Sequence, residues 1–196
     1  MSEDGANKSR RRFLTGAVSV VGGVGVAYTA VPFLSYWNPS ARTRAAGAPV
    51  EVDTSTMQPG QKINLTWRGQ PVWVIRRSEA ALERLPELND RLRDPDSTVA
   101  SQQPPYAQNI YRSVDPEFLV LVPICTHLGC IPSFMPQPGS LDTNWPGGLF
   151  CPCHGSRFDL AGRVYSGVPA PTNLVVPPYR VADDGLIVVG EDEEAA

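Results

Sequence analysis

Six residues that can bind a soft metal ion lie in two short boxes of the sequence. The first box, Cys125–Cys130, reads CTHLGC, and the second, Cys151–Ser156, reads CPCHGS. Together they contain all four cysteines and both histidines of the 196-residue chain. Because thiolates and imidazoles are ligands of zinc and of iron–sulfur centres, the sequence predicts that the chemistry of this protein takes place between the two boxes.

Two kinds of metal centre could use these residues. Zinc binds thiolates and imidazoles in tetrahedral sets, usually supplied by closely spaced cysteine pairs. Each box here instead pairs one cysteine with one histidine, Cys125 with His127 and Cys151 with His154, and has one cysteine left over. Two cysteines and two histidines are the ligand set of a 2Fe–2S cluster in which histidines replace two thiolates on one iron. The remaining cysteines could then join the loops through a disulfide.

Both boxes resemble those of the high-potential Rieske iron–sulfur proteins at every chemically demanding position. When the ligand positions of the family's motif are matched to this sequence, the resemblance implies four ligands to a 2Fe–2S cluster: Cys125, His127, Cys151 and His154. The cysteines are implied to bind one iron and the histidines the other. The resemblance also implies a disulfide between Cys130 and Cys153. Rieske ferredoxins and oxygenases share only the ligand spacing and lack this extra cysteine pair.

The same resemblance assigns further roles near the cluster. His154 would contact the quinol, Leu128 would shield the cluster from solvent, and Ser156 would donate a hydrogen bond to a cluster sulfide. Many members of the family have tyrosine where this chain has Phe158. The chain therefore lacks one hydrogen-bond donor to a cysteine sulfur, which predicts a somewhat lower potential and leaves menaquinol open as an alternative to ubiquinol.

A cluster with two imidazole ligands is suited to oxidising a hydroquinone. Imidazoles are neutral donors, so replacing two anionic thiolates lowers the negative charge on the cluster and raises its reduction potential. Each imidazole also keeps a titratable nitrogen, whose proton affinity rises on reduction. Uptake of an electron is therefore coupled to uptake of a proton.

The N-terminus has the features of an export signal. Residues 9–14 read SRRRFL and resemble a twin-arginine signal. The same arginines are expected to hold residues 1–15 in the cytoplasm by the positive-inside rule. A domain that receives its cluster in the cytoplasm must be exported already folded, which is the chemical reason for such a signal.

The export signal is followed by a candidate membrane anchor. Gly16–Trp37 is a run of 22 residues without a charge. At a rise of about 1.5 Å per residue it would span about 33 Å as a helix, enough for a hydrocarbon core of about 30 Å. A cleaved signal has a shorter apolar region, so we expect an uncleaved, single-pass anchor in a bacterial inner membrane. The head domain is then periplasmic.

The rest of the chain predicts a mainly β head domain with antiparallel strands. Proline makes up 20 of the 196 residues, about twice the usual usage of ~5%, which favours rigid loops. Alternating or continuous apolar runs predict strands at residues 62–67, 71–75, 118–124, 178–182 and 186–189. The first two strands are expected to form a hairpin through residues 68–70, and the last two a hairpin through residues 183–185. Ser78 can cap a helix that Pro86 divides, and residues 93–113 predict an ordered loop without regular structure.

The domain organisation follows from these segments. Residues 38–49 lack an apolar period and are expected to be a flexible tether. The head domain then covers residues 50–190, with its cluster-binding part at about residues 120–172, and residues 191–196 form an acidic tail. Residues 167–171, GVPAP, resemble the proline loop that covers the cluster in the Rieske family.

The charge distribution excludes a nucleic-acid partner. The formal net charge is −3; the first 37 residues carry a net +2 and the remainder a net −5. The head therefore has no excess of basic residues and no interleaved aromatic array with which to bind a phosphate backbone.

The order of signal, anchor, tether, boxes and proline loop resembles the Rieske subunit of ubiquinol–cytochrome c reductase, respiratory complex III. This implies electron transfer from ubiquinol at cytochrome b to cytochrome c1, within a dimeric complex in membrane lipid. One alternative is the Rieske subunit of another exported oxidoreductase, such as arsenite oxidase, but the insertion at residues 78–113 and the long anchor favour complex III. Another is a structural metal-stapled binding domain, and a visible absorption spectrum separates this case because zinc is colourless.

Overall fold

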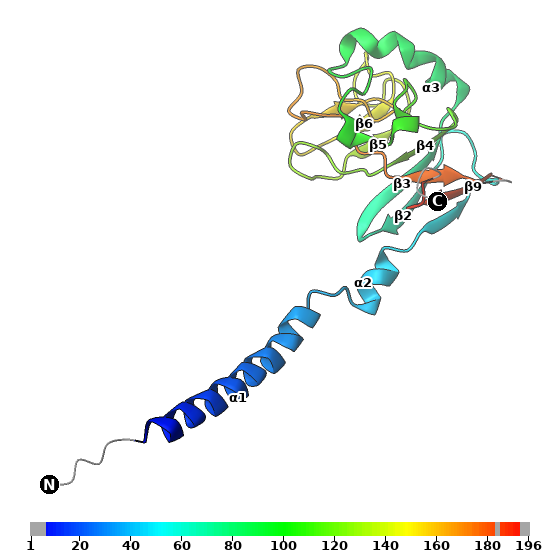
Figure 1. Cartoon of the computed structure of the whole chain (residues 1–196). Coiled ribbons are helices and arrows are strands. Elements are labelled where there is room, and N and C mark those ends of the chain that lie inside the picture. The colour runs from blue at the N-terminus through cyan, green and yellow to red at the C-terminus, as the bar shows by residue number, and fades with distance from the viewer. Residues whose placement is uncertain (1–6, 183–184, 193–196) are drawn as a thin grey trace. The chain divides into compact units, whose positions relative to one another are not determined.

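The computed structural model describes residues 7–182 and 185–192 and divides the chain into two compact units, Met1–Ala45 and Ala46–Ala196. The first unit contains helix α1, Lys8–Ser35 (Figure 1). Within the described residues it is the one helix whose length and composition allow it to cross a membrane, which confirms the expected apolar N-terminal helix. It begins before the predicted span because the Asn7 side chain accepts hydrogen bonds from the N–H groups of Ser9 and Arg10, satisfying free donors of the first turn.

The segment after α1 contains a short helix that the sequence interpretation omits. Helix α2, Ala41–Ala46, lies within the residues expected to form an irregular tether. Ser40 accounts for it: its hydroxyl accepts a hydrogen bond from the Thr43 N–H at 3.2 Å, and its carbonyl accepts one from the Arg44 N–H. The Ser40 side chain thus caps and stabilises a short helix in a segment whose apolar residues show no helical period.

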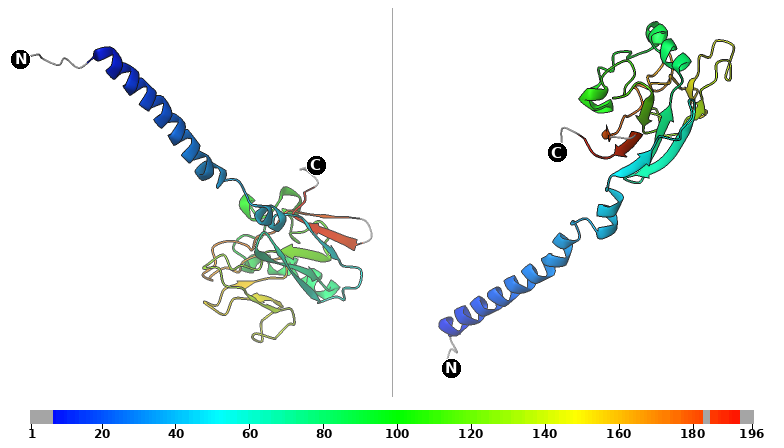
Figure 2. Two further views of the ribbon diagram at one scale, coloured as in Figure 1. Left: turned by 90° about the horizontal axis from the view of Figure 1, so that it is seen from below. Right: turned by 90° about the vertical axis from the view of Figure 1, so that its right-hand side faces the viewer.

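The described residues of the second unit, the head, form three antiparallel sheets of three strands each, in the orders β1–β9–β8, β2–β3–β4 and β5–β6–β7. This confirms the predicted mainly β fold. Helix α3 lies towards the end of the head that holds β5 and β6, and β2 and β9 lie towards the other (Figures 1 and 2). The strands are β1 Val50–Asp53, β2 Lys62–Trp67, β3 Gln70–Arg76, β4 Phe118–Leu121, β5 Ser133–Met135, β6 Gly148–Phe150, β7 Arg157–Phe158, β8 Tyr179–Val181 and β9 Leu186–Val189.

The first predicted hairpin is present, with a tighter turn than expected. Trp67 pairs with Gln70, so only Arg68 and Gly69 form the connection between β2 and β3. Their φ angles are 50° and 74°. Two consecutive residues with positive φ are what a two-residue hairpin turn needs to match the twist of its strands.

The insertion between β3 and β4 also follows the sequence pattern. Helix α3, Glu79–Arg84, is followed by the 3-10 helix η1, Pro86–Arg91, so Pro86 divides the two as predicted. Ser78 is at the N-cap position, but its side chain makes no capping hydrogen bond. The prediction that residues 93–113 lack regular structure is wrong in two places, because the segment contains two short 3-10 helices, η2 Ala100–Gln102 and η3 Pro105–Ala107.

Strands β3 and β4 separate two apolar cores. Because successive side chains of a strand point to opposite faces, Val72, Val74 and Val120 enter the core shared with β1, β8 and β9. The alternating residues enter a second core that contains both cysteines without a disulfide: Trp73, Ile75, Leu119 and Leu121, packed with Leu149, Phe158, Leu174, Cys125 and Cys151. The second core therefore places the two boxes on a rigid sheet.

The C-terminal hairpin closes the first core. Strands β8 and β9 pair as predicted, and β1 pairs with β9. Residues 183 and 184 of the predicted turn lie outside the described residues, as do residues 193–196 of the predicted acidic tail. At the start of that tail, Glu191 accepts a hydrogen bond from Arg180 at 2.7 Å.

We predict that Gly148→Ala destabilises the head. A Cβ atom at Gly148 would overlap the carbonyl oxygen of Phe158 and lie 3.2 Å from the Trp145 ring, so β6 and β7 would have to separate. We expect a loss of about 3 kcal/mol or more and a fall in melting temperature of roughly 6–12 °C, measured by thermal unfolding of the detergent-solubilised protein. The control is Gly139→Ala, which has a positive φ of 74° but open space around it and should lose only about 1–2 kcal/mol. Equal losses in the two variants would contradict the prediction.

Candidate metal centre

The two boxes are loops at the ends of buried strands. The first follows β4 and residues 122–124, where the Val122 N–H donates to the Val175 carbonyl. The second connects β6 to β7, whose pairing of Phe150 with Arg157 brackets it. Each box is therefore held at its base by sheet hydrogen bonds, while the tip is formed by residues outside the strands.

The two loops have the same backbone hydrogen bonds. In each, the cysteine N–H donates to the carbonyl five residues later, from Cys125 to Cys130 and from Cys151 to Ser156, both at 2.8 Å. In each, a glycine N–H donates back to that cysteine's carbonyl at 2.9 Å, and the φ angles of these glycines, Gly129 and Gly155, are 83° and 79°. Glycine is favoured there because positive φ strains other residues. The sequence repeat thus produces two copies of one loop geometry.

The first cysteines of the two loops lie together in the second core. Cys125 and Cys151 are 2% and 1% exposed, and both lack a disulfide. Burial raises the pKa of the Cys125 thiol, and the neighbouring Cys151 thiol raises it further. Without a metal both groups would therefore be neutral thiols, and as thiolates, the form that binds a metal, they would need a cation beside them.

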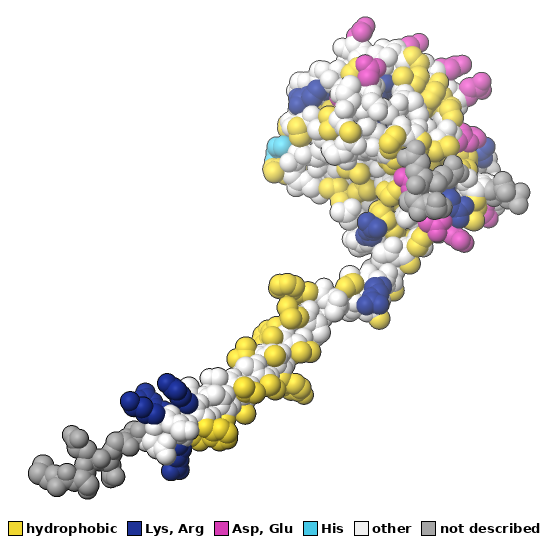
Figure 3. All heavy atoms as spheres, in the orientation of Figure 1, with side chains coloured by type: hydrophobic (Ala, Val, Ile, Leu, Met, Phe, Trp, Pro, Cys, Tyr) yellow, Lys and Arg dark blue, Asp and Glu magenta, His cyan; other side chains and the backbone are white. Residues whose placement is uncertain are grey.

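The two imidazoles lie at the surface above the cysteines. The ring centroids of His127 and His154 are 4.7 Å apart, and the ring planes are close to perpendicular at 88°. His154 is exposed and His127 is partly buried, and Figure 3 shows an imidazole at the edge of the head beside hydrophobic side chains. Leu128 is 71% exposed and Ile131 is 55% exposed. The exposed tip of the site is therefore formed by apolar side chains and by the edges of the two imidazole rings.

The other two cysteines form the implied disulfide. Cys130 and Cys153 are bonded across the two loops, with their Cα atoms 6.7 Å apart. Their sulfurs and that of Cys151 lie within 4.8 Å of one another, but sulfurs bonded to each other cannot serve as thiolate ligands. Two thiols and two imidazoles remain, which is the donor set that a histidine-ligated 2Fe–2S cluster requires. The residues present fit that group.

The proline loop is tied to both boxes and to the insertion. The Ala170 N–H donates to the Ser156 hydroxyl at 3.1 Å, and the Thr126 hydroxyl donates to the Thr172 carbonyl at 2.8 Å. Arg93 donates to the Val168 carbonyl at 3.1 Å. The sequence interpretation missed Thr126 and Arg93: the hydroxyl beside the ligands in the first box was an available signal for Thr126, whereas nothing local marks Arg93.

Ser156 and Phe158 are both completely buried, at the end of the second box and just after it. The Ser156 side chain is completely buried and hydrogen-bonds to the Cys125 thiol, which lowers the pKa of that thiol against the effect of burial. Phe158 is also completely buried and packs in the core that contains Cys125 and Cys151.

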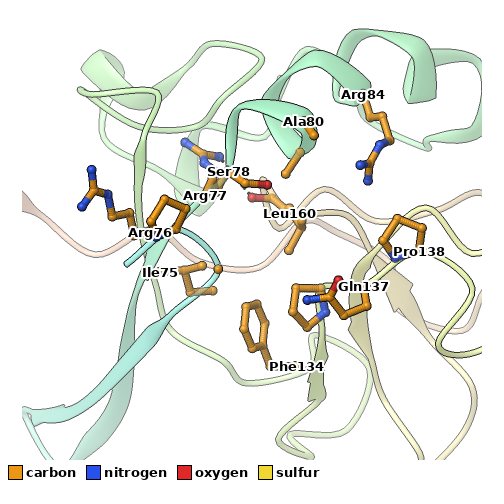
Figure 4. Close-up of a pocket in the computed structure, with 14 residues that line it drawn as sticks. Ile75, Arg76, Arg77, Ser78, Ala80, Arg84, Phe134, Gln137, Pro138 and Leu160 are labelled. Carbon is orange, nitrogen blue, oxygen red and sulfur yellow. Dashed lines mark hydrogen bonds between the residues drawn. The ribbon is translucent and has the colours of Figure 1, made fainter. Parts of the chain in front are cut away.

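A separate pocket of about 320 Å³ lies between the end of β3, helix α3 and the loop after β5 (Figure 4). None of the residues lining it belongs to either box. Its arginines are engaged within the protein: Arg76 pairs with Glu117 at 2.7 Å, and Arg84 donates to the Pro146 carbonyl at 2.9 Å. The pocket therefore marks the junction of the insertion with the loop between the boxes.

Comparison with known proteins gives matches along the whole chain. Residues 49–180 match the family model described as the Rieske [2Fe-2S] domain, and residues 1–40 match the one described as the ubiquitinol-cytochrome C reductase Fe-S subunit TAT signal. The ubiquinol-cytochrome c reductase iron-sulfur subunit of Allochromatium vinosum is 54% identical, over 100% of this chain and 95% of that protein. The subunit of the same name from Blastochloris viridis is 43% identical, over 96% and 97%. A solved structure, "Hyperthermophilic respiratory Complex III", aligns with a TM-score of 0.48 at 27% identity, covering 89% of this chain and 98% of that chain.

We predict that Phe158→Tyr raises the midpoint potential of the 2Fe–2S cluster. A hydroxyl at this position can donate to a ligand sulfur, and such a bond strengthens when the cluster gains negative charge. A difference of about 0.5–1.5 kcal/mol between the two redox states corresponds to roughly 20–65 mV, at about 59 mV per tenfold for one electron. Redox titration measures the change. Phe118→Tyr, which adds a hydroxyl beside the other core, should leave the midpoint unchanged; a fixed or lower midpoint for Phe158→Tyr would show that this position does not tune the cluster.

Proposed function

This chain belongs to the Rieske iron–sulfur subunits of ubiquinol–cytochrome c reductase, and from that membership we propose that it transfers one electron from ubiquinol to cytochrome c1 in respiratory complex III. The observation that carries the proposal is the arrangement of the donors: two buried thiols beneath two imidazoles that reach the surface. This arrangement would shield the cysteines, which bind as anions, from water and would expose the neutral histidines to a partner protein.

The four donors have distinct roles in the proposed site. Cys125 and Cys151 would hold one iron of the 2Fe–2S cluster, and His127 and His154 would hold the other. When bound, the cluster supplies a one-electron acceptor whose potential is raised by its neutral imidazole ligands. Ser156, which is buried beside Cys125, would donate a hydrogen bond to a cluster sulfide and so favour the more negative redox state,.

The exposed tip is suited to meeting a quinol in an apolar pocket of cytochrome b. His154 is the more exposed imidazole, and its free ring nitrogen can accept a hydrogen bond and a proton from a quinol hydroxyl. Leu128 and Ile131 surround it with exposed apolar surface. On docking they exclude water from the ligand histidines, which is the sense in which Leu128 shields the cluster.

The N-terminal unit fits attachment of an exported head to a membrane. In our proposal residues 1–15 are cytoplasmic, residues 16–37 cross the bacterial inner membrane, and residues 38–49 are the tether of a periplasmic head. The basic residues at the start of α1 agree with this orientation,. The complex that receives the head is proposed to be dimeric, with cytochrome b and cytochrome c1 as partners. The export-signal match at residues 1–40 belongs to this family, so the arsenite oxidase alternative has no observation in its favour.

Replacing either histidine should abolish function. The chain has only two histidines, so His127→Ala or His154→Ala leaves no substitute ligand. We expect loss of the reduced-cluster electron paramagnetic resonance signal and of quinol oxidation in the assembled complex. The matched control is Leu128→Ala, which should keep the cluster signal because the side chain is 71% exposed and should lose quinol oxidation only in part. A full-intensity signal from either histidine variant would exclude the proposed ligand set.

The tether should act through its mobility. Two or three prolines introduced between residues 41 and 48 would break α2 and stiffen the segment. Turnover of the complex should then slow several-fold because head movement becomes limiting, while the cluster spectrum stays intact. Alanine at Arg42 and Thr43 preserves the helix and serves as the control. Unchanged turnover in the proline variants would rule out a moving head in this protein.

A further inference from the structure

The pocket in Figure 4 is large enough to hold a small molecule. Its volume is about 320 Å³, which falls within the range of about 300–1,000 Å³ that is usual for small-molecule sites. Most of its lining comes from three segments, which are the end of β3, helix α3 and the loop after β5. Because no residue of the two boxes lines it, this pocket is a separate feature from the candidate metal centre.

The charged side chains that line the pocket are all positive. Among the described residues, three arginines line it and no aspartate or glutamate does: Arg76, Arg77 and Arg84. Arg76 is paired with Glu117 at 2.7 Å. Arg77 is 2% exposed, and all three nitrogens of its guanidinium group donate hydrogen bonds within the protein. Two of the three arginines therefore already have their partners.

Arg84 is the arginine that remains available to a ligand. Its Nη1 donates to the Pro146 carbonyl at 2.9 Å, which uses one of the five N–H donors of a guanidinium group. In the part of the chain that the structure describes, no carboxylate lies within ion-pair distance of Arg84. The acidic residues of its own helix, Glu79 and Glu83, are exposed and do not line the pocket. In Figure 4 the Arg84 side chain extends from α3 towards the loop after β5, so its free donors can meet an anion in the pocket.

Two neutral polar side chains line the same pocket. Ser78 is partly buried at the N-cap position of α3, and its hydroxyl makes no capping hydrogen bond. Gln137 is exposed and takes part in its turn through its backbone carbonyl, which accepts a hydrogen bond from the Ser140 hydroxyl at 2.7 Å. A hydroxyl and a side-chain amide can each donate to an anion, so both can add to the hydrogen bonds from Arg84.

Apolar side chains complete the lining. Ile75 and Leu160 are 1% and 5% exposed, and Phe134 is partly buried against the cores that contain them. All three line the pocket and are drawn in Figure 4. Contact with apolar surface stabilises a hydrocarbon group by removing it from water, whereas a bare inorganic ion gains nothing from such contact.

We propose that this pocket binds a small organic anion, with its carboxylate beside Arg84 and its apolar body against Ile75, Phe134 and Leu160. A guanidinium group can hold a carboxylate through two parallel hydrogen bonds, and the apolar side chains account for the rest of the lining. The bound anion would join the insertion to the loop between the boxes, because α3 supplies Arg84 and the segment after the first box supplies Phe134. This site goes beyond the proposed electron transfer and does not depend on it.

The first test compares three probes that separate the charge of the ligand from its apolar body. Isothermal titration calorimetry is carried out on the full-length, detergent-solubilised protein, and the heat of titration into detergent alone is subtracted. Benzoate has both parts, benzyl alcohol has the ring without the charge, and inorganic phosphate has charge without the ring. Benzoate should saturate one site and bind at least about tenfold more tightly than either of the others. Absence of saturable benzoate binding, or equal affinity for benzyl alcohol or phosphate, would overturn the proposal.

The second test places the benzoate in this pocket. Gln137→Glu adds a negative charge to the lining, and Gln137→Met removes the same amide without adding a charge; the exposed position lets both variants fold. Benzoate should bind to Gln137→Glu about fivefold or more weakly than to Gln137→Met, and Arg84→Met should weaken binding about tenfold or more. Equal affinities of the two Gln137 variants would place the benzoate elsewhere and contradict the proposal. If Arg84→Met fails to accumulate, the Gln137 pair decides. The paramagnetic signal of the wild-type protein reports separately on the cluster, so its absence would count against the proposed function instead.

Discussion

Two cysteines buried side by side can bind as thiolates only with a cation between them, and this requirement organises the head. Cys125 and Cys151 lie within an apolar core, where a pair of thiolates cannot persist without a positive partner. The loops around them are closed by backbone hydrogen bonds of one kind, the two remaining cysteines join the loops, and the proline loop is bonded to both boxes. Each of these features limits how far the four donors can move apart.

The division of β3 and β4 between two cores explains how a small site is held firmly. One face of these strands packs in the core shared with β1, β8 and β9, and the other packs in the core that contains the cysteines. A shift of the boxes would disturb packing on both faces, because interiors are close-packed. The insertion adds Arg77 and Arg112 from the side, which ties the turn after the second box to a segment far away in the sequence.

The cysteines and the histidines of the site differ in their exposure to solvent. The sulfurs are buried while the imidazoles reach solvent beside exposed Leu128 and Ile131. In the proposed function, electron and proton uptake would meet at the imidazole edge, where a quinol bound in a partner could reach them. In the same proposal the buried cysteines would keep water from one side of the cluster, where nearby dipoles and charges would tune its affinity for the electron,.

The sequence by itself determined the candidate donors, the apolar helix and the main hairpins. All cysteines and histidines fall in two boxes, and local signals such as the division of the insertion at Pro86 and the pairing of β2 with β3 are short-range. Only the tertiary structure decided that β5 and β7 form, because these strands have three and two residues and are too short to show an alternation of apolar and polar residues. It also decided that Phe158 belongs to the same core as the cysteines and that Arg77, Arg112 and Arg163 are buried. The physical reason is that a charged side chain can be buried only where distant carbonyls converge on it, and no local pattern in the sequence records that convergence.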